Sequence, residues 1–186
     1  MTNFVKPLVR RYERPVQTNF RARLGMLRLM ANSVQMLLCD QLARNAFRGT
    51  AEACHYDRVA LELSLELREQ LLGKKSLDST CTATPLPGDL YPPYVVFLVL
   101  PLMHSEALPH HELGLELLDW SLENFPKDLV GTLDEHRAAL NDHKDILERF
   151  GRYPHRNAKQ GRYNTQEESA WLADAENLPG WAKSQG

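Results

Sequence analysis

The stretch 129–150, LVGTLDEHRAALNDHKDILERF, decides the fold class of this chain. Its apolar residues recur at spacings of three and seven, which places them on one side of an α-helix of about six turns. The members of this stripe are Leu133, Leu140, Leu147 and Phe150. Gly151 suits the backbone that ends a helix and Pro154 cannot continue one, so the helix is predicted to stop at residue 150.

Helical spacing also extends toward the N-terminus. A long helix is predicted from Thr18 to a stop at Gly49, because apolar residues recur there at spacings of three, four and seven. Its apolar face comprises Phe20, Leu24, Leu27, Val34, Leu37 and Leu38. Residues 51–72 alternate as a strand would but also fit a helix. Their length and their content of Glu, Leu, Arg and Gln favour a helix.

Three further segments complete an all-α prediction. Residues 94–103 form a buried apolar run whose β-branched content would suit a strand, but no partner strands are predicted, so a core helix is expected. Pro109 fits the first turn of a helix that runs to about Asn124. Thr165 and Glu168 have the spacing of a capping box, which opens a short last helix. The fold class is all-α, with antiparallel helix pairs.

The length of 186 residues indicates one domain. Residues 1–16 are expected to be a basic extended arm, followed by a single helical domain over 17–186. Within it, residues 73–93 are a long proline-rich loop, either disordered or a lid over a site. Residues 1–48 hold nine of the 22 Lys and Arg residues but only two of the 24 acids, so an acidic partner is conceivable, although packing on the protein's own acidic helices is favoured.

Composition argues against several function classes. The three cysteines lack CxxC spacing, so reduced thiols in the cytoplasm are the expectation, with no disulfide framework and no metal site. The longest apolar run is too short to span a membrane. Phosphate-loop, dinucleotide and zinc-protease motifs are missing, so no cofactor is expected. Nucleic acid is not favoured as a partner, and the oligomeric state is left open.

Three polar clusters interrupt the helical pattern, at residues 40–49, 103–106 and 149–162. His104 and Glu106 follow the buried segment, while His136 and His143 share the stripe of the 129–150 helix. A histidine on such a stripe is more often a hydrogen-bonded core residue than a catalyst. Because carboxylates and arginines accompany them, the candidate catalytic residues are nevertheless His104, Glu106 and His143.

The candidate ligand-binding residues are mostly arginines, whose planar fork suits carboxylate or phosphate. They are Asp40, Arg44, Arg48, Arg149, Arg152, His155, Arg156 and Arg162, with Lys159 among the cations of the third cluster. Arg44 and Arg48 stand one turn apart with like charges, which is unfavourable unless anions or carboxylates lie between them. A purely structural network that ties helix ends together would explain the same pattern.

At these clusters the chain resembles an uncharacterised family of bacteria and fungi, domain of unknown function 924, over about residues 34–172. The matching residues of the first block are Asp40, Gln41, Arg44, Asn45, Arg48 and Gly49. Those of the second are Leu100, Pro101, His104, Ser105 and Glu106. Those of the third are Arg149, Phe150, Gly151, Arg152, Pro154, His155, Arg156, Asn157, Gly161 and Arg162. The resemblance implies a tetratricopeptide-like helical array and brings no established activity.

The sequence therefore predicts a small-molecule pocket protein. Its ligand would be a small anionic or carbonyl-bearing organic molecule, held in an anion-binding pocket. If the protein is an enzyme, a cofactor-independent isomerase or cyclase of biosynthesis is expected, with proton transfer by histidine. The alternative is a non-catalytic tetratricopeptide-like scaffold that binds a peptide or protein. A weaker third possibility is an RNA-binding accessory.

Overall fold

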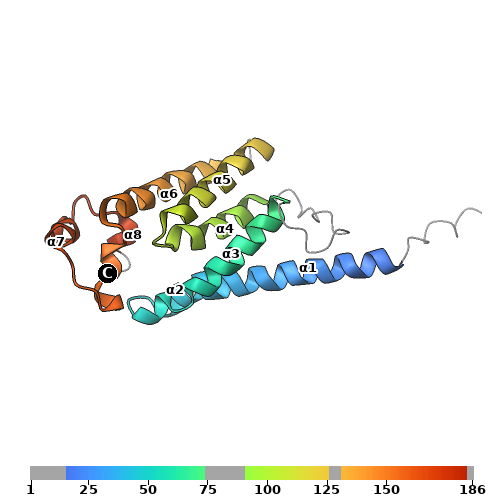
Figure 1. Ribbon diagram of the computed structural model, residues 1–186, viewed down its shortest axis with the longest axis horizontal. Coiled ribbons are helices and arrows are strands. Elements are labelled where there is room, and N and C mark those ends of the chain that lie inside the picture. Colours follow the sequence, from blue (N-terminus) through green and yellow to red (C-terminus); the bar gives the residue numbers. More distant parts are fainter. Residues whose placement is uncertain (1–15, 74–90, 126–130, 184–186) are drawn as a thin grey trace, which may run out of the picture.

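The computed structural model describes residues 16–73, 91–125 and 131–183, and every regular element among them is helical (Figure 1). The all-α prediction is therefore confirmed for this part of the chain. The α-helices are α1 (Val16–Leu37), α2 (Ala43–Ala46), α3 (Asp57–Leu71), α4 (Tyr91–His104), α5 (Leu108–Asn124), α6 (Gly131–Phe150), α7 (Gln166–Ala173) and α8 (Gly180–Lys183). The shorter elements are the π-helical η1 (Leu38–Leu42) and the 3₁₀ turns η2 (Ala51–Cys54), η5 (Pro154–Arg156) and η6 (Ala158–Gln160).

Local sequence signals account for the helix ends. Gly49 and Gly151 both have positive φ, 84° and 70°, as the predicted helix stops require. The Thr165 hydroxyl accepts from the Glu168 N–H, and the Glu168 carboxylate accepts from the Thr165 N–H, so the capping box is present. Residues 1–15 of the predicted arm and most of the predicted loop lie outside the described residues. Val16, the last residue of the predicted arm, begins α1, and α4 begins at Tyr91, inside the loop's expected range.

The large helices stack in chain order. α1 packs on α3, α3 on α4, α4 on α5, and α5 on α6, while α6 also contacts α4. Figure 1 shows α1 along one edge of this stack, and α7 and α8 together at one end. Each large helix thus packs on the next large helix in the chain. The tetratricopeptide-like geometry remains a prediction.

The core centres on α4, because this helix is apolar on all sides. Val95, Leu98, Val99 and Leu102 are fully buried. A Cβ atom at Gly114 would lie 2.9 Å from the Leu140 Cδ2 atom, so the glycine lets α5 approach α6 closely. None of the described helices combines the length and apolar character needed to cross a membrane.

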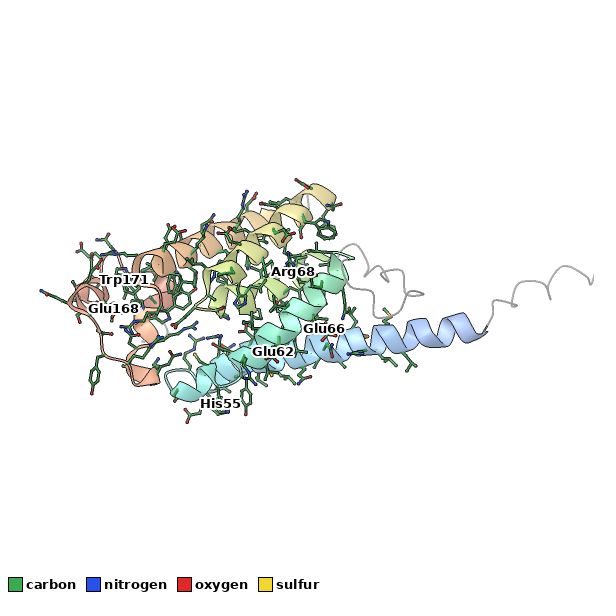
Figure 2. The ribbon with its side chains drawn as sticks, in the orientation of Figure 1. His55, Glu62, Glu66, Arg68, Glu168 and Trp171 are labelled. Carbon is green, nitrogen blue, oxygen red and sulfur yellow. The ribbon has the colours of Figure 1, made fainter. Side chains whose placement is uncertain are left out.

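Charged side chains of α3 connect the stack on both sides. Arg68 is 1% exposed, donates to the carbonyl of Leu113 and pairs with Glu69 and Glu116, which joins α3 to α5. Figure 2 labels Arg68 and, further along α3, Glu66, which pairs with Arg28 of α1 at 3.5 Å. The buried guanidinium has partners on two helices, which a charge in the interior requires.

The apolar face predicted for the first helix does not point at the core. Leu24, Leu27, Val34 and Leu38 are at least half exposed, whereas Met36 and Asp40 on another side are 1% and 2% exposed. The helix has two apolar sides, and the one that α3 and α4 cover includes Leu29 and Met36. Periodicity finds a helix with an apolar stripe but cannot choose between two such stripes.

Candidate functional site

Asp40 lies at the centre of a buried polar network. It sits in η1, where one turn of π-helix interrupts the α1–α2 helix, an arrangement common at functional sites. Its carboxylate accepts from Gln41 Nε2 at 2.6 Å, from Arg44 Nε at 3.2 Å and from His104 Nδ1 at 2.7 Å. Burial raises the pKa of Asp40, but His104 and Arg44 outweigh burial and hold that pKa well below its usual range.

His104, the last residue of α4, is oriented by this carboxylate. Burial lowers the pKa of His104 more than Asp40 raises it, so the imidazole is neutral at pH 7. Since Nδ1 donates to Asp40, the neutral ring leaves Nε2 as a lone-pair acceptor. The same division between an orienting carboxylate and an acceptor nitrogen serves general-base histidines in enzymes.

Two arginines from distant parts of the chain meet at Asp57, the first residue of α3. The Asp57 carboxylate lies 2.7 Å from Arg44 Nη2 and 3.7 Å from Arg156 Nη1. Arg156 also donates to the carbonyl of His104 at 2.8 Å, and its guanidinium lies 4.7 Å from the centre of the Tyr153 ring. Burial and the nearby charge of Arg44 both lower the pKa of Arg156, although an arginine stays protonated at neutral pH.

A pocket of about 80 Å³ opens beside this arginine pair. Four cations line it, and no carboxylate is among the described residues of its wall. The lining comprises Arg44, Arg48, Gly49, Thr50, Ala51, Ala53, Cys54, Arg156, Lys159 and Gln160. We call it the cationic pocket. Nε of Arg156, a residue of the pocket wall, is buried and has no hydrogen-bond partner in the described part of the chain.

A group of aromatic and histidine side chains packs behind the network. The hydroxyl of the fully buried Tyr153 donates to the carbonyl of Met103 at 2.6 Å and lies 3.0 Å from His111 Nε2. His143 stacks on Trp181, with ring centres 3.9 Å apart, and its Nδ1 donates to the carbonyl of Ala139 at 2.7 Å. Burial lowers the pKa of His143 to about 3, so it is neutral at pH 7.

Glu106 holds a second ion pair. Arg162 contacts both of its carboxylate oxygens, at 2.6 and 2.8 Å, and the N–H of Tyr153 donates to the same carboxylate at 3.0 Å. Arg152 donates two hydrogen bonds, of 2.6 and 2.8 Å, to the carboxylate of Glu168 on α7. Arg149 forms an ion pair with Glu167 at 2.9 Å. Figure 2 labels Glu168 and Trp171 on α7, at the end of the molecule opposite the free end of α1.

The structure thus divides the predicted site residues into three groups. One group surrounds the cationic pocket and the buried carboxylate, and it contains Asp40, Arg44, Arg48, His104 and Arg156. A second attaches the C-terminal segment, and it contains Glu106, Arg149, Arg152 and Arg162. The third, His143 and His155, is buried beside Tyr153 and Trp181.

Sequence reasoning missed several residues of the pocket region. Asp57 supplies the carboxylate that two arginines share, and Cys54 and Thr50 line the pocket. The helix predicted over 51–72 begins at Asp57 in the structure, and with that start the sequence signal of an acid in the first turn would have drawn attention to Asp57. Among the described residues, no group of three or more His, Cys, Asp or Glu side chains could hold a metal ion.

Comparisons with known proteins place the chain in a family without a known activity. It is similar to a solved protein of unknown function from Agrobacterium tumefaciens, with 28% identity and a TM-score of 0.53, over 85% of this chain and 78% of that one. No curated protein matches the sequence. The model of the family described as "Bacterial protein of unknown function (DUF924)" matches residues 7–176, and the chain therefore belongs to this family.

Proposed function

We propose that the protein binds a small organic anion, a molecule with a carboxylate or phosphate group, in the cationic pocket. The observation that supports this most is that Arg44, Arg48, Arg156 and Lys159, from two distant parts of the chain, line one pocket without a carboxylate among its described wall residues. A concave site with one sign of charge concentrates ligands of the opposite sign. The small volume suits a ligand of a few non-hydrogen atoms.

A thermal-shift series tests the sign of the site. Glyoxylate and inorganic phosphate should raise the melting temperature, and the effect should fade with added salt. Binding at 100 times the dissociation constant would stabilise the fold by about 2.7 kcal/mol. Acetamide and ethylamine serve as neutral and cationic controls. Equal stabilisation by either control would refute the proposal.

Variants at the rim locate the binding. Arg48 is exposed and Lys159 half-buried, so Arg48→Gln and Lys159→Gln should weaken the effect of the anions with little change in the stability of the free protein. Arg58→Gln is the matched control, because Arg58 is 87% exposed on α3 and pairs only loosely with Glu62 at 3.5 Å. If all three variants reduce the anion effect equally, the anions respond to the overall charge of the protein and not to the cationic pocket.

We infer further that, if the protein is an enzyme, His104 transfers the proton. Both pocket arginines contact the surroundings of His104: Arg44 binds Asp40, which binds the imidazole, and Arg156 donates to the backbone carbonyl of His104. Arginines that hold a carbonyl-bearing acid would stabilise negative charge on its oxygen while Nε2 of His104 accepts a proton from the adjacent carbon. This chemistry is that of a cofactor-independent isomerase or cyclase.

Deuterium exchange separates catalysis from binding. In D₂O, the protein should speed the exchange of protons next to the carbonyl of a small 2-oxo acid such as pyruvate. His104→Ala should abolish that acceleration while leaving a thermal shift with the acid. If exchange is unaccelerated although the acid binds, the site is a binding site alone.

A scaffold function is the alternative, and one observation favours it. The outward side of α1 and η1 carries an apolar stripe of Leu24, Leu27, Met30, Val34, Leu38 and Leu42, each 50–61% exposed. Exposed apolar stripes of this kind mark protein contacts. A helical partner is expected, and a second copy of this chain provides the first test. Concentration-dependent sedimentation that Leu27→Lys with Val34→Lys abolishes would support it, and a monomer at all concentrations would exclude self-association.

A further inference from the structure

Cys54 places a nucleophilic sulfur in the wall of the cationic pocket. It is the last residue of η2, is half-buried and carries a free thiol. Its Sγ atom lies 3.7 Å from Arg44 Nη1, within the range of a weak hydrogen bond to sulfur. The Arg44 guanidinium therefore contacts the Cys54 thiol through Nη1 and the Asp57 carboxylate through Nη2.

A second observation concerns Arg156, which lies in the same pocket wall as Cys54. Arg156 lines the pocket, is 5% exposed, and uses Nη1 for the His104 carbonyl and Asp57. Its buried Nε has no hydrogen-bond partner among the described residues. Because an unpaired buried donor is costly, a ligand oxygen near Arg156 would be favoured.

We propose that Cys54 is a site of reversible covalent modification by small disulfides that carry carboxylates. The inference rests on the anion binding proposed for the same pocket. Arg48 and Lys159 attract the carboxylate at the rim, and the Cys54 thiolate attacks the nearer sulfur of the bound disulfide. A new sulfur–sulfur bond forms to Cys54, the original one breaks, the distal half leaves as a thiolate, and the Cys54 proton passes to solvent.

The modified protein would lose its anion site. A carboxylate attached through Cys54 would occupy part of the pocket beside Arg44 and Arg156, and its negative charge would oppose the binding of a second anion. Thiol–disulfide exchange would then couple the redox state of small thiols to ligand binding. Reduction by an excess of thiol reverses the modification.

Cys39 provides an internal reference in the same chain. It lies in η1, is half-buried, and lies beside Asp40 rather than in the cationic pocket. Burial, and then the charge of Asp40, raise the pKa of the Cys39 thiol. Negative charge next to Cys39 should repel an anionic reagent, whereas the surroundings of Cys54 should attract one.

The test compares two reagents of different charge on the full chain. One is 5,5′-dithiobis(2-nitrobenzoate), a disulfide with two carboxylates, and the other is the neutral 4,4′-dithiodipyridine. Mass spectrometry of peptides gives the rate at each cysteine. The preference for the anionic reagent should be at least about tenfold greater at Cys54 than at Cys39, and salt should reduce it.

Variants separate this inference from the proposed function. Arg48→Gln and Lys159→Gln should reduce the Cys54 rate with the anionic reagent several-fold but leave the neutral reagent's rate unchanged, and Arg58→Gln should change neither. Glyoxylate should raise the melting temperature of the unmodified protein, whereas the wild-type mixed disulfide at Cys54 should lose that shift and regain it after reduction. If Cys54 reacts with neither reagent, or shows no preference for the anionic one, the inference fails even where anions still bind.

Discussion

Asp40 shows how one residue can organise a site. A carboxylate that is 2% exposed needs several donors, and it obtains them from Gln41 and Arg44 on its own helix and from His104 on α4. Because Arg44 also contacts Asp57 and Cys54, the network reaches the pocket wall. Removing any one partner would leave another buried polar group without a hydrogen bond, so these residues act as a unit.

Arg44 should therefore be a large contributor to stability. Arg44→Ala leaves Asp40 and Asp57 without their shared cation, and we expect it to lower the free energy of unfolding by about 3 kcal/mol or more. Arg44→Lys should lose less of this free energy than Arg44→Ala but still some of it, because one ammonium cannot reach Asp40, Asp57 and Cys54 together. Urea denaturation measures the difference. Arg58→Ala should stay within about 0.5 kcal/mol, and a similar loss there would contradict the role of burial.

His143 should make the fold sensitive to acid. Burial lowers its pKa from 6.5 to about 3, so the unfolded chain takes up this proton first as the pH falls. The free energy of unfolding is unaffected by this titration above pH 6.5 and decreases as the pH falls from 6.5 toward 3. The decrease due to His143 should amount to about 2 kcal/mol between pH 7.5 and 5. The positive charge of Arg156 disfavours protonation further.

The measurement is the free energy of unfolding against pH for the wild type and His143→Phe, which keeps an aromatic ring beside Trp181. Other buried histidines lower both curves, so the informative quantity is the difference between them. The free energy of unfolding of the wild type should fall by about 2 kcal/mol more than that of the variant as the pH falls through this range. A constant difference from pH 7.5 to 5 would mean that His143 does not titrate as described.

At the scale of elements, helix identity could be predicted but helix orientation could not. The 129–150 stripe is buried as expected, with Leu133, Leu140 and Leu147 at most 2% exposed. In α1 the stripe that periodicity identified faces outward, because Met36 and Asp40 take the inward positions. A buried aspartate interrupts the apolar pattern on the inward side, so periodicity did not favour that side over the outward stripe. The site shows the same limit, since the partners of Asp40 depend on contacts between helices.

Truncation of a side chain should cost much more stability on the buried side of α1 than on its exposed side. Met36→Ala removes a side chain that is 1% exposed and should cost about 2–4 kcal/mol of unfolding free energy. Val34→Ala lies two residues earlier but is 54% exposed, and should cost less than about 0.5 kcal/mol. Thermal or urea unfolding of the two variants measures this. Similar losses at both positions would show that the outward stripe is covered in solution.

At the scale of the whole molecule, the third sequence block serves mainly to attach the C-terminal segment. Glu106 binds Arg162 and the Tyr153 backbone, and Arg152 binds Glu168. From this attached segment only Arg156, Lys159 and Gln160 reach the cationic pocket. The spacing of arginines in the sequence indicates an anion site, but it does not distinguish arginines that bind carboxylates of the protein from those available to a ligand.

Breaking the Glu106 contacts should therefore loosen one part of the chain. Glu106→Ala removes a two-pronged ion pair and a bond to the Tyr153 N–H, each partly buried, while α1, α3 and α4 keep their mutual contacts. Amides of residues 152–173 should then exchange hydrogen roughly 10- to 100-fold faster, and those of α3 and α4 at unchanged rates. Mass spectrometry of peptides resolves the two regions.

Because Arg156 and Lys159 belong to the loosened segment, Glu106→Ala should also weaken stabilisation by glyoxylate. Arg162→Ala should reproduce both effects, since it removes the other half of the same pair. Glu167→Ala is the control, because its pair with Arg149 is at least half exposed on both sides and should contribute little to either measurement. If exchange rises equally in α3, the C-terminal segment unfolds only with the rest of the molecule, and the pocket cannot be opened from this end.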